Sequence, residues 1–345
     1  MADRIEHNGH QGLRKKIIIC FFILVAIFII SFFLGRYRIP FSDFTGIVGQ
    51  LLTGAEIEQY QIFTIFYNIR LPRLILVTLT GTVLALAGAS YQSIFHNPLV
   101  SPGILGVSAG ACFGVALGLL VAPGSYLAIY LLAFIFGTLA VGFCYLLTLW
   151  GKGGNVMTMV LAGVIITSLF NALISLLKFV ADPYEELPSI VYWLMGSFSN
   201  AGWTEVLYSL PIMLPGIIIL LFYRWHLNVL SMGDEEALSL GINVVPVRLI
   251  IICLNTIMVA AVVATTGQVT WIGLVVPHMA RFIFGSNHRY MLPAAALMGS
   301  SLLLVIDNLA RTMVAVEIPI SIISALIGTP FFAYLLITKR ESGWN

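Results

Sequence analysis

Long apolar stretches, separated by short polar segments, run through almost the whole chain. A helix needs about 20 apolar residues to cross the hydrocarbon core of a bilayer, so each long stretch predicts a membrane-spanning helix. A further stretch at 190–200 is too short to cross and predicts an interfacial or re-entrant helix near the outer face. The predicted fold is an all-α polytopic membrane protein, with residues 1–345 forming one transmembrane domain. Its ten predicted spans lie at about 17–34, 74–92, 104–122, 126–149, 156–179, 206–223, 248–266, 271–285, 291–310 and 318–338.

The composition supports this fold class. Hydrophobic residues make up 59% of the chain and charged residues only 9%, whereas soluble domains carry about 25% charged residues. The net charge of +2, without a basic tract interleaved with aromatic residues, excludes a nucleic-acid partner. All four cysteines lie in apolar runs without metal-ligand spacing, so we expect neither a metal site nor a disulfide framework.

Basic residues indicate the orientation, because they are retained on the cytoplasmic side of a membrane protein. With both termini inside, eleven of the 17 lysines and arginines fall on the inner side. The exceptions include Arg36, Arg38, Arg70, Arg73 and Arg311, which this orientation places at the outer side. We therefore expect some other requirement to hold arginines there.

The seam between the second and third predicted spans, at 96–103, is rich in proline and glycine. Lipid offers backbone groups no hydrogen bonds, so non-helical chain at membrane depth survives only where protein covers it or a watery cavity adjoins it. The seam is therefore either part of a passage through the membrane or an ordinary polar turn between two helices.

The inner segment at about 226–246 is amphipathic, unlike the stretches on either side. Ser231 or Asp234 can cap a helix start, and Gly241 can end the helix in a left-handed conformation. This pattern predicts two short helices at the cytoplasmic face, with an acidic surface that also carries leucines. Such a surface is either a solvated connector or the docking site of a soluble partner.

Few polar residues lie inside the predicted spans. Asn171, Ser175 and Lys178 are three or four residues apart and so share one face of the fifth span, where Lys178 either lines a path or extends to the interface. Asp307 and Arg311, one helical turn apart, are expected to pair. Glycines at helical spacing predict close packing of helices. These glycines are Gly81, Gly88, Gly106, Gly110, Gly114 and Gly118.

No catalytic or nucleotide-binding motif is present, because the sequence contains no GxxxxGK[ST], HExxH or GxSxG pattern. We therefore expect a transport protein rather than an enzyme, and any ATP that drives transport must bind to a separate polypeptide. An ion-coupled secondary transporter is disfavoured, since most acidic residues lie in loops or near span ends and form no pairs at the membrane centre.

Seven short motifs occur in order between residues 60 and 338. They are RLPR at 70–73, HNPLVSPGILGVSAG at 96–110, LAGV at 161–164, YWLMGSF at 192–198, GDEEALSLGINV at 233–244, GLVVPHMAR at 273–281 and ALIGTPFF at 325–332. Because of the order and spacing of these motifs, the chain resembles permease subunits of the FecCD family, which import iron–siderophore complexes, haem and cobalamin through ABC transporters.

The resemblance implies a cobalamin-permease-like architecture, with ten spans per subunit and twenty in a homodimer around a path on the two-fold axis. It implies a multi-pass protein of the cytoplasmic (inner) membrane of a prokaryote, in contact with membrane lipid. The partners would be a second copy of the chain, two cytoplasmic ABC ATPase subunits and an extracytoplasmic substrate-binding protein, either periplasmic or lipid-anchored. The chain itself would bind no cofactor, because ATP and Mg would be held by the ATPase.

The resemblance also assigns docking residues. Arg70, Arg73 and Arg311 match arginines that receive glutamates of the binding protein. Exposed ion pairs of this kind are worth about 0–1 kcal/mol each, so they would orient the binding protein more than hold it. The coupling helices of the family match the segment at 231–244, which favours docking of the ATPase there. The matching residues are Ser231, Gly233, Asp234, Glu235, Glu236, Ala237, Leu238, Leu240 and Gly241.

For the gate and the path, the resemblance points to two regions. The inner gate falls on the loop with Asn97 and Leu99, together with residues near the start of the fifth span such as Thr158. The fifth span would line the path, where Asn171 and Ser175 are the candidate residues. Transport would proceed by alternating access, driven by closure of the two ATPase subunits.

Two classes of cargo stay open. A metal chelate, namely an iron(III)–siderophore, haem or corrinoid, is the first hypothesis, because the spans offer glycine, hydroxyl groups and methionine rather than rings of one charge. An oxyanion such as molybdate or tungstate is the alternative, since some similar permeases carry oxyanions.

Overall fold

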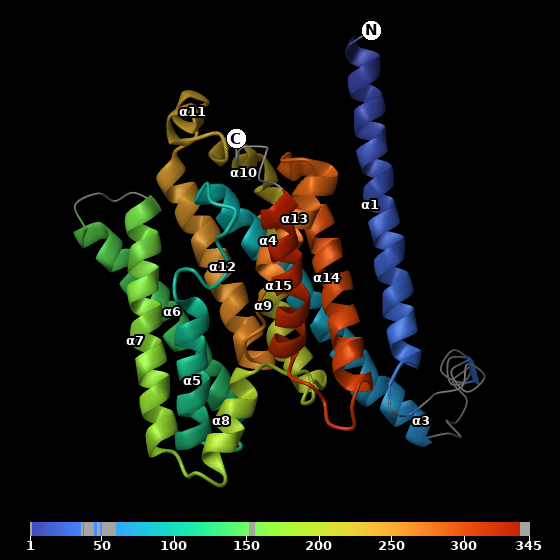
Figure 1. The fold of residues 1–345 in the computed structure, drawn as a ribbon, viewed down its shortest axis with the longest axis vertical. Helices are drawn as coiled ribbons and strands as arrows, with labels where there is room; N and C mark the ends of the chain where they lie inside the picture. Colours follow the sequence, from blue (N-terminus) through green and yellow to red (C-terminus); the bar gives the residue numbers. More distant parts are fainter. Residues whose placement is uncertain are drawn as a thin grey trace.

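The computed structural model describes residues 2–35, 37, 45, 46, 49, 60–151 and 156–338, and every regular element within these ranges is helical. Most of the helices run along one another in a single bundle, with α1 at its edge (Figure 1). Arg36 and Arg38 lie outside the described residues. In chain order the elements are α1 (Ala2–Phe33), α3 (Tyr60–Thr64), the π-helix η1 (Ile65–Arg70), α4 (Leu71–Ile94), α5 (Val107–Val121), α6 (Tyr126–Trp150), α7 (Val156–Val180), α8 (Glu186–Leu194), α9 (Trp203–Phe222), α10 (Arg224–Leu230), α11 (Asp234–Ser239), α12 (Val244–Thr266), α13 (Ile272–Phe284), α14 (His288–Thr312) and α15 (Ile320–Thr338).

Seven of the described helices are long and apolar enough to cross a membrane, and three shorter apolar helices accompany them. The long ones are α1, the continuous helix Tyr60–Ile94, α6, α7, α9, α12 and α14, and the shorter ones are α5, α13 and α15. Each of the ten apolar stretches therefore coincides with a helix, so the protein is an all-α polytopic membrane protein as predicted. Ten membrane crossings stay a prediction.

Two helix boundaries differ from the sequence prediction. The span predicted at about 74–92 begins well before residue 74, because α3, η1 and α4 form one unbroken helix over Tyr60–Ile94. Pro72 lies at the start of α4, directly after the π-helical turn of η1. The short helix expected at 190–200 is α8, which ends at Leu194 because the following glycine, Gly196, takes a φ of +72°.

Glycine contacts hold the centre of the bundle together, as the spacing predicted. Gly81 of α4 lies against the backbone of Gly299 in α14, and Gly88 against that of Gly273 in α13. A methyl group at Gly88 would overlap the Gly273 carbonyl, so only glycine permits this approach. Most of α4 and α14 is consequently buried.

The two ends of the bundle carry different elements. One end, here called the α10–α11 end, carries the two short helices and the end of α15, and α1 also starts at this end (Figure 1). At the other end, here called the α8 end, lie α8, the η1 turn and the end of α14 (Figure 1).

Two of the apolar helices, α5 and α13, begin inside the bundle rather than at one of its ends. The segment after α4 runs back along the bundle without helical structure before α5 starts at Val107 (Figure 1). A second non-helical segment, 267–271, precedes α13. Positive φ angles of +86° at Gly106 and +70° at Trp271 turn the chain into these helices.

Candidate functional site

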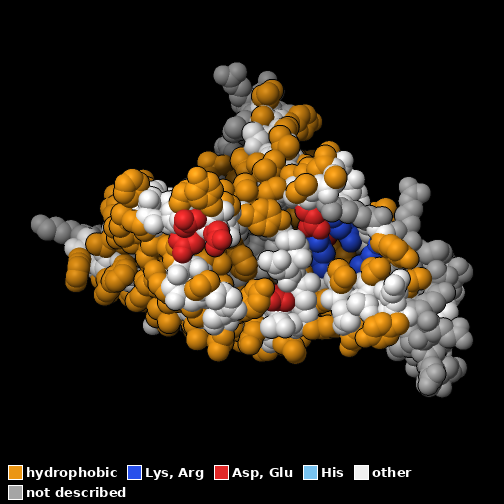
Figure 2. Space-filling view, turned by 90° about the horizontal axis from the view of Figure 1, so that it is seen from below, with side chains coloured by type: hydrophobic (Ala, Val, Ile, Leu, Met, Phe, Trp, Pro, Cys, Tyr) orange, Lys and Arg blue, Asp and Glu red, His pale blue; other side chains and the backbone are white. Residues whose placement is uncertain are grey.

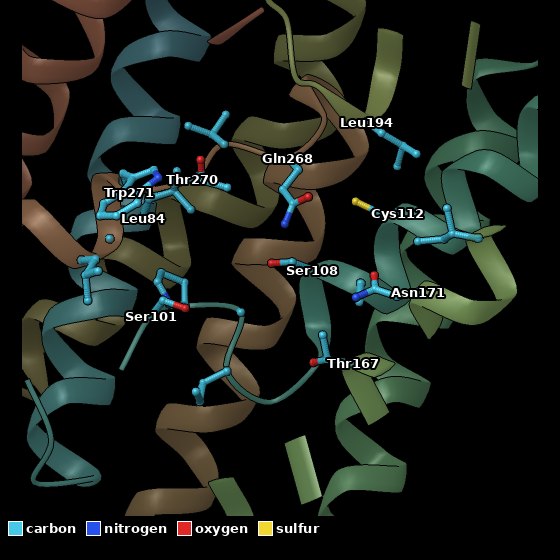
Figure 3. Close-up of a pocket in the computed structure, with 18 of the residues that line it drawn as sticks. Leu84, Ser101, Ser108, Cys112, Thr167, Asn171, Leu194, Gln268, Thr270 and Trp271 are labelled. Atoms are coloured by element: carbon cyan, nitrogen blue, oxygen red, sulfur yellow. The ribbon is translucent and has the colours of Figure 1, made fainter. Parts of the chain in front are cut away.

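A cavity of about 570 Å³ lies where the two non-helical segments meet α7 (Figure 3). Ser101 and Pro102 of the first segment and Gln268 and Trp271 of the second form part of its wall. Along α7 the lining extends from Val164 to Lys178, so the cavity runs from the middle of the bundle toward the α8 end. The seam at 96–103 is therefore no ordinary turn, because part of it lines a cavity as non-helical chain within a membrane bundle requires.

Apart from Lys178, most polar side chains of the cavity carry hydroxyl or amide groups. Asn171 and Lys178 lie on the lining, which confirms that these two residues share one face of α7. Ser175 does not line the cavity, and its hydroxyl donates a hydrogen bond to the Asn171 carbonyl oxygen at 2.9 Å. The side chains labelled in Figure 3 include Ser108, Asn171 and Gln268, which come from three different elements.

Sequence reasoning missed most of this lining. Thr167 and Ser168 lie on the same stripe of α7 as Asn171, so helical spacing could have identified them. Ser108 and Gln268 gave no such signal, because only the fold brings α5 and the 267–271 segment next to α7. Within the described residues no group of three or more His, Cys, Asp or Glu side chains could hold a metal ion.

The proposed gate residues lie away from this cavity. Asn97 and Leu99 are exposed, and the Asn97 Oδ1 accepts a hydrogen bond from the Leu99 N–H at 2.9 Å. Thr158 is half-buried in the first turn of α7, with its methyl group beside Gly151. None of the three lines the cavity.

A polar network, missed from the sequence, ties the seam to α10. The His96 Nε2 lies 2.8 Å from the carbonyl oxygen of Leu230, the last residue of α10, and His96 takes a φ of +48°. One turn earlier, Ser93 of α4 contacts His288 of α14, whose Nδ1 lies 2.8 Å from the Asn228 Oδ1 of α10. The last turns of α4, the start of α14 and α10 are therefore held together at the α10–α11 end.

The segment at 226–246 forms the two short helices that the sequence predicted, α10 and α11. Leu238 and Leu240 are 61% and 55% exposed, whereas Ala237 is buried, so the acidic and leucine-bearing surface is confirmed. The expected cap at Ser231 or Asp234 is wrong. Gly233, with a φ of +132°, precedes α11, Asp234 is the first residue of α11, and Ser231 is the residue that follows α10. Gly241, at φ +79°, is left-handed as predicted.

Of the other residues in this segment, Glu235 and Glu236 are exposed in the first turn of α11. Asp234 pairs with Arg248 of α12 at 2.7 Å, which fixes α11 to the bundle. Acidic groups in a first helical turn are favoured by the helix dipole.

The outer arginines form a cluster at the α8 end, here called the arginine cluster, of Arg70, Arg73 and Arg311 with Asp307 and Glu317. Arg73 contacts Asp307 at 2.8 Å and Glu317 at 2.9 Å. Arg311 pairs with Asp307 at 3.5 Å, which confirms the expected i, i+4 pair.

All three arginines of the cluster are buried, so the expectation that they stand exposed is wrong. Arg70 donates to the carbonyl oxygens of Phe32 and Tyr37, and Arg311 donates to that of Ser31 at 2.7 Å. On the face at the α8 end, Lys and Arg side chains gather in one place with acidic groups beside them (Figure 2). The cluster joins the end of α1 to α4 and α14, and its docking role stays a prediction.

Comparisons with known proteins agree on one family. A sequence model of the FecCD transport family matches residues 23–338. The chain is 39% identical to the molybdate import system permease protein MolB of Haemophilus influenzae, over 94% of this chain and 95% of that one. It is 40% identical to the hemin transport system permease protein HmuU of Yersinia pestis, over 80% and 84%. A solved structure of an inward-facing ABC transporter, assigned to the metal-chelate type, superposes with a TM-score of 0.85 at 35% identity, covering 94% of this chain and 99% of that one.

Proposed function

Because the chain belongs to the FecCD transport family of ABC importer permeases, we propose that it moves an iron(III)–siderophore complex, or a related chelate such as haem or a corrinoid, into the cytoplasm. The observation that supports this cargo is the cavity of about 570 Å³. Sites for organic ligands of moderate size occupy roughly 300–1,000 Å³. Its hydroxyl and amide groups can accompany a chelate without fixing it in place, as a transport path requires.

The α10–α11 end is the proposed cytoplasmic side. There the exposed leucines and acidic residues of α11 would dock an ATPase subunit. Closure of two such subunits, one on each copy of a homodimer, would move α10 and α11. The hydrogen bond from His96 to Leu230 would pass this motion to the seam that holds Asn97 and Leu99 and continues into the cavity wall.

The α8 end is the proposed outer side, where a substrate-binding protein would dock. The guanidinium group of Arg73 already pairs with the carboxylates of Asp307 and Glu317, so a carboxylate of the binding protein would have to replace one of them. Glu317 is the replaceable one, because its side chain is 24% exposed whereas that of Asp307 is fully buried. Docking through this cluster is therefore an exchange of carboxylates.

A second candidate cargo is an oxyanion such as molybdate or tungstate. The observation that favours it is the 39% identity to the MolB permease, which extends over 94% of the chain. A tetrahedral oxyanion is only a few times larger than a water molecule, whose share of liquid volume is about 30 Å³. It would fill little of the cavity, which is why we place it second.

The experiment that separates the two cargoes uses the complete importer in liposomes, with its ATPase and its binding protein. Uptake of a ferric tris-hydroxamate, of haem and of radiolabelled molybdate is measured with ATP inside or outside the vesicles. We expect ATP-dependent uptake of at least one chelate. Uptake of molybdate alone would transfer the assignment to the second candidate, and uptake of none of the three would contradict both.

A further inference from the structure

Lys178 is the one charged side chain on the lining of the cavity within the described part of the chain. The other polar groups there belong to neutral side chains, most of them hydroxyls and amides. Lys178 is half-buried near the end of α7, and the ion pairs among the described residues do not include it. Among the described residues no carboxylate lies within ion-pair distance of its ammonium group, so its field acts on whatever occupies the cavity.

Two helices that start at the cavity add a field of the same sign. The first turns of α5 and α13 contribute Ser108 and Gly273 to the lining. Their N-cap residues, Gly106 and Trp271, make no side-chain capping hydrogen bond. A helix N-terminus carries a partial positive charge of roughly half an elementary charge. The cavity thus holds one full and two partial positive charges, opposed only by the partial negative charge at the end of α12, two residues before Gln268, and no carboxylate stands on its described lining.

We propose that this cavity selects cargo of net negative charge and that Lys178 is the residue that sets this preference. The proposal deepens the proposed function, since it names the charge of the substrate. An anionic ferric chelate and an oxyanion share this chemistry, whereas free metal cations and cationic chelates do not. A lysine that merely extends to the membrane interface would leave the cavity without this preference.

The potential inside the cavity can be measured without knowing the cargo. A cysteine replaces Asn171 in the intact importer, after the four native cysteines are replaced by alanine. Its reaction rates are measured with a negatively charged and a positively charged methanethiosulfonate reagent, the sulfonatoethyl and trimethylammonioethyl forms. The rate with the negative reagent is divided by the rate with the positive reagent, and this ratio is then divided by the same ratio for a free thiol in solution. The corrected ratio exceeds one where the local potential is positive.

Residues 171 and 178 are seven positions apart, which corresponds to about 10 Å along a helix. At that distance, removing one charge should change the ratio of the two rates about fourfold or more, even at the dielectric constant of water. We expect the corrected ratio to exceed one, to fall by this factor in Lys178→Gln, and to reverse in Lys178→Glu. Lys178→Arg and the remote Lys15→Gln should leave it unchanged.

A second reporter, Ser108→Cys, guards against misfolding of the first, because oxygen is replaced by sulfur at nearly constant shape. A ratio unchanged by Lys178→Gln and Lys178→Glu at both reporter positions would overturn the proposal, whatever the importer carries. These rates do not depend on transport, so failure of the proposed function would not affect them.

Uptake then tests the consequence and separates the two sources of negative charge. Molybdate and a ferric tris-catecholate are supplied to the complete importer, and initial rates are compared between Lys178→Glu and Lys178→Arg. We expect the glutamate variant to import the accepted anion at least fivefold more slowly at equal ATPase activity. Equal uptake by the two variants would refute Lys178 as the residue that sets the preference.

Discussion

The two ends of the molecule each hold an arginine–aspartate pair at nearly the same distance, yet in different surroundings. Arg73 and Asp307 at the α8 end lie 2.8 Å apart, with side chains that are 8% and 0% exposed. Arg248 and Asp234 at the α10–α11 end lie 2.7 Å apart, with side chains that are 14% and 50% exposed. Distance alone therefore does not decide what an ion pair contributes, because a buried charge that loses its partner has no water to replace it.

The surroundings match the roles proposed for the two ends. At the α8 end one aspartate serves two arginines and joins α4 to α14, with α1 attached through backbone carbonyls. At the α10–α11 end, hydrogen bonds of Leu230 and Asn228 tie α10 to the bundle, the pair of Asp234 and Arg248 ties α11 to it, and exposed leucines face outward. The first arrangement suits a fixed frame, and the second suits a docking surface that moves.

The largest effect is expected for Asp307→Asn. The substitution leaves Arg73 and Arg311 buried with one carboxylate fewer, and breaking a buried pair costs about 3–5 kcal/mol. Thermal unfolding of the purified protein in lipid nanodiscs should show a much lower midpoint. Asp234→Asn is the matched control at the other end and should shift the midpoint little. Equal shifts in the two variants would contradict the contrast between the ends.

A smaller effect, on binding rather than folding, is expected for Leu238→Asp. Loss of a central apolar contact in an interface typically costs about 2 kcal/mol or more, so co-purification of the ATPase subunit should fall more than tenfold. The unfolding midpoint should not change, because Leu238 is exposed. Ser239→Asp places the same charge on the next residue of α11 and serves as the control. Full retention of the ATPase in Leu238→Asp would refute the docking surface.

A still smaller effect, that of losing one hydrogen bond, is expected for His96→Ala. A typical hydrogen bond contributes about 0.5–1.5 kcal/mol, so the protein should stay folded. The link between α10 and the seam would be lost, and less cargo should enter for each ATP hydrolysed. The measurement is the ratio of uptake to ATP hydrolysis in liposomes. His96→Gln, which can still donate to the Leu230 carbonyl, should recover part of the ratio, and an unchanged ratio in His96→Ala would exclude this link.

The smallest effect is expected for the pair of Asp234 and Arg248. A double-mutant cycle with Asp234→Asn and Arg248→Gln should give a coupling energy below about 1 kcal/mol, as for other partly exposed pairs. The coupling should also weaken as the salt concentration rises, because exposed charges are screened. A coupling of several kcal/mol that is insensitive to salt would place this pair in the same class as Arg73 and Asp307.

Much of the fold followed from the sequence, because span length and helical spacing are local properties. The apolar stretches marked the helices, glycine spacing marked the close contacts, and the Asn171–Lys178 stripe marked one wall of the cavity. The α10 and α11 helices followed from their amphipathic pattern, although the residue before α11 proved to be Gly233.

The partners of the arginines could not be predicted in the same way. Arg73 finds Asp307 and Glu317 at sequence separations of 234 and 244 residues, and no local pattern reports contacts of that range. The expectation of exposed arginines failed for this reason. Ser108 and Gln268 escaped notice likewise, since their place on the cavity depends on two helices that start inside the bundle.

The measurement that tests the account most directly is cargo uptake by liposomes with and without the separate ATPase. The permease and the binding protein are reconstituted alone, with a catalytically inactive ATPase variant, or with the active ATPase. We expect uptake against a gradient only with the active subunit and ATP. Accumulation of cargo by the permease alone, without ATP, would contradict the central claim that this chain is the passive conduit of an ATP-driven importer.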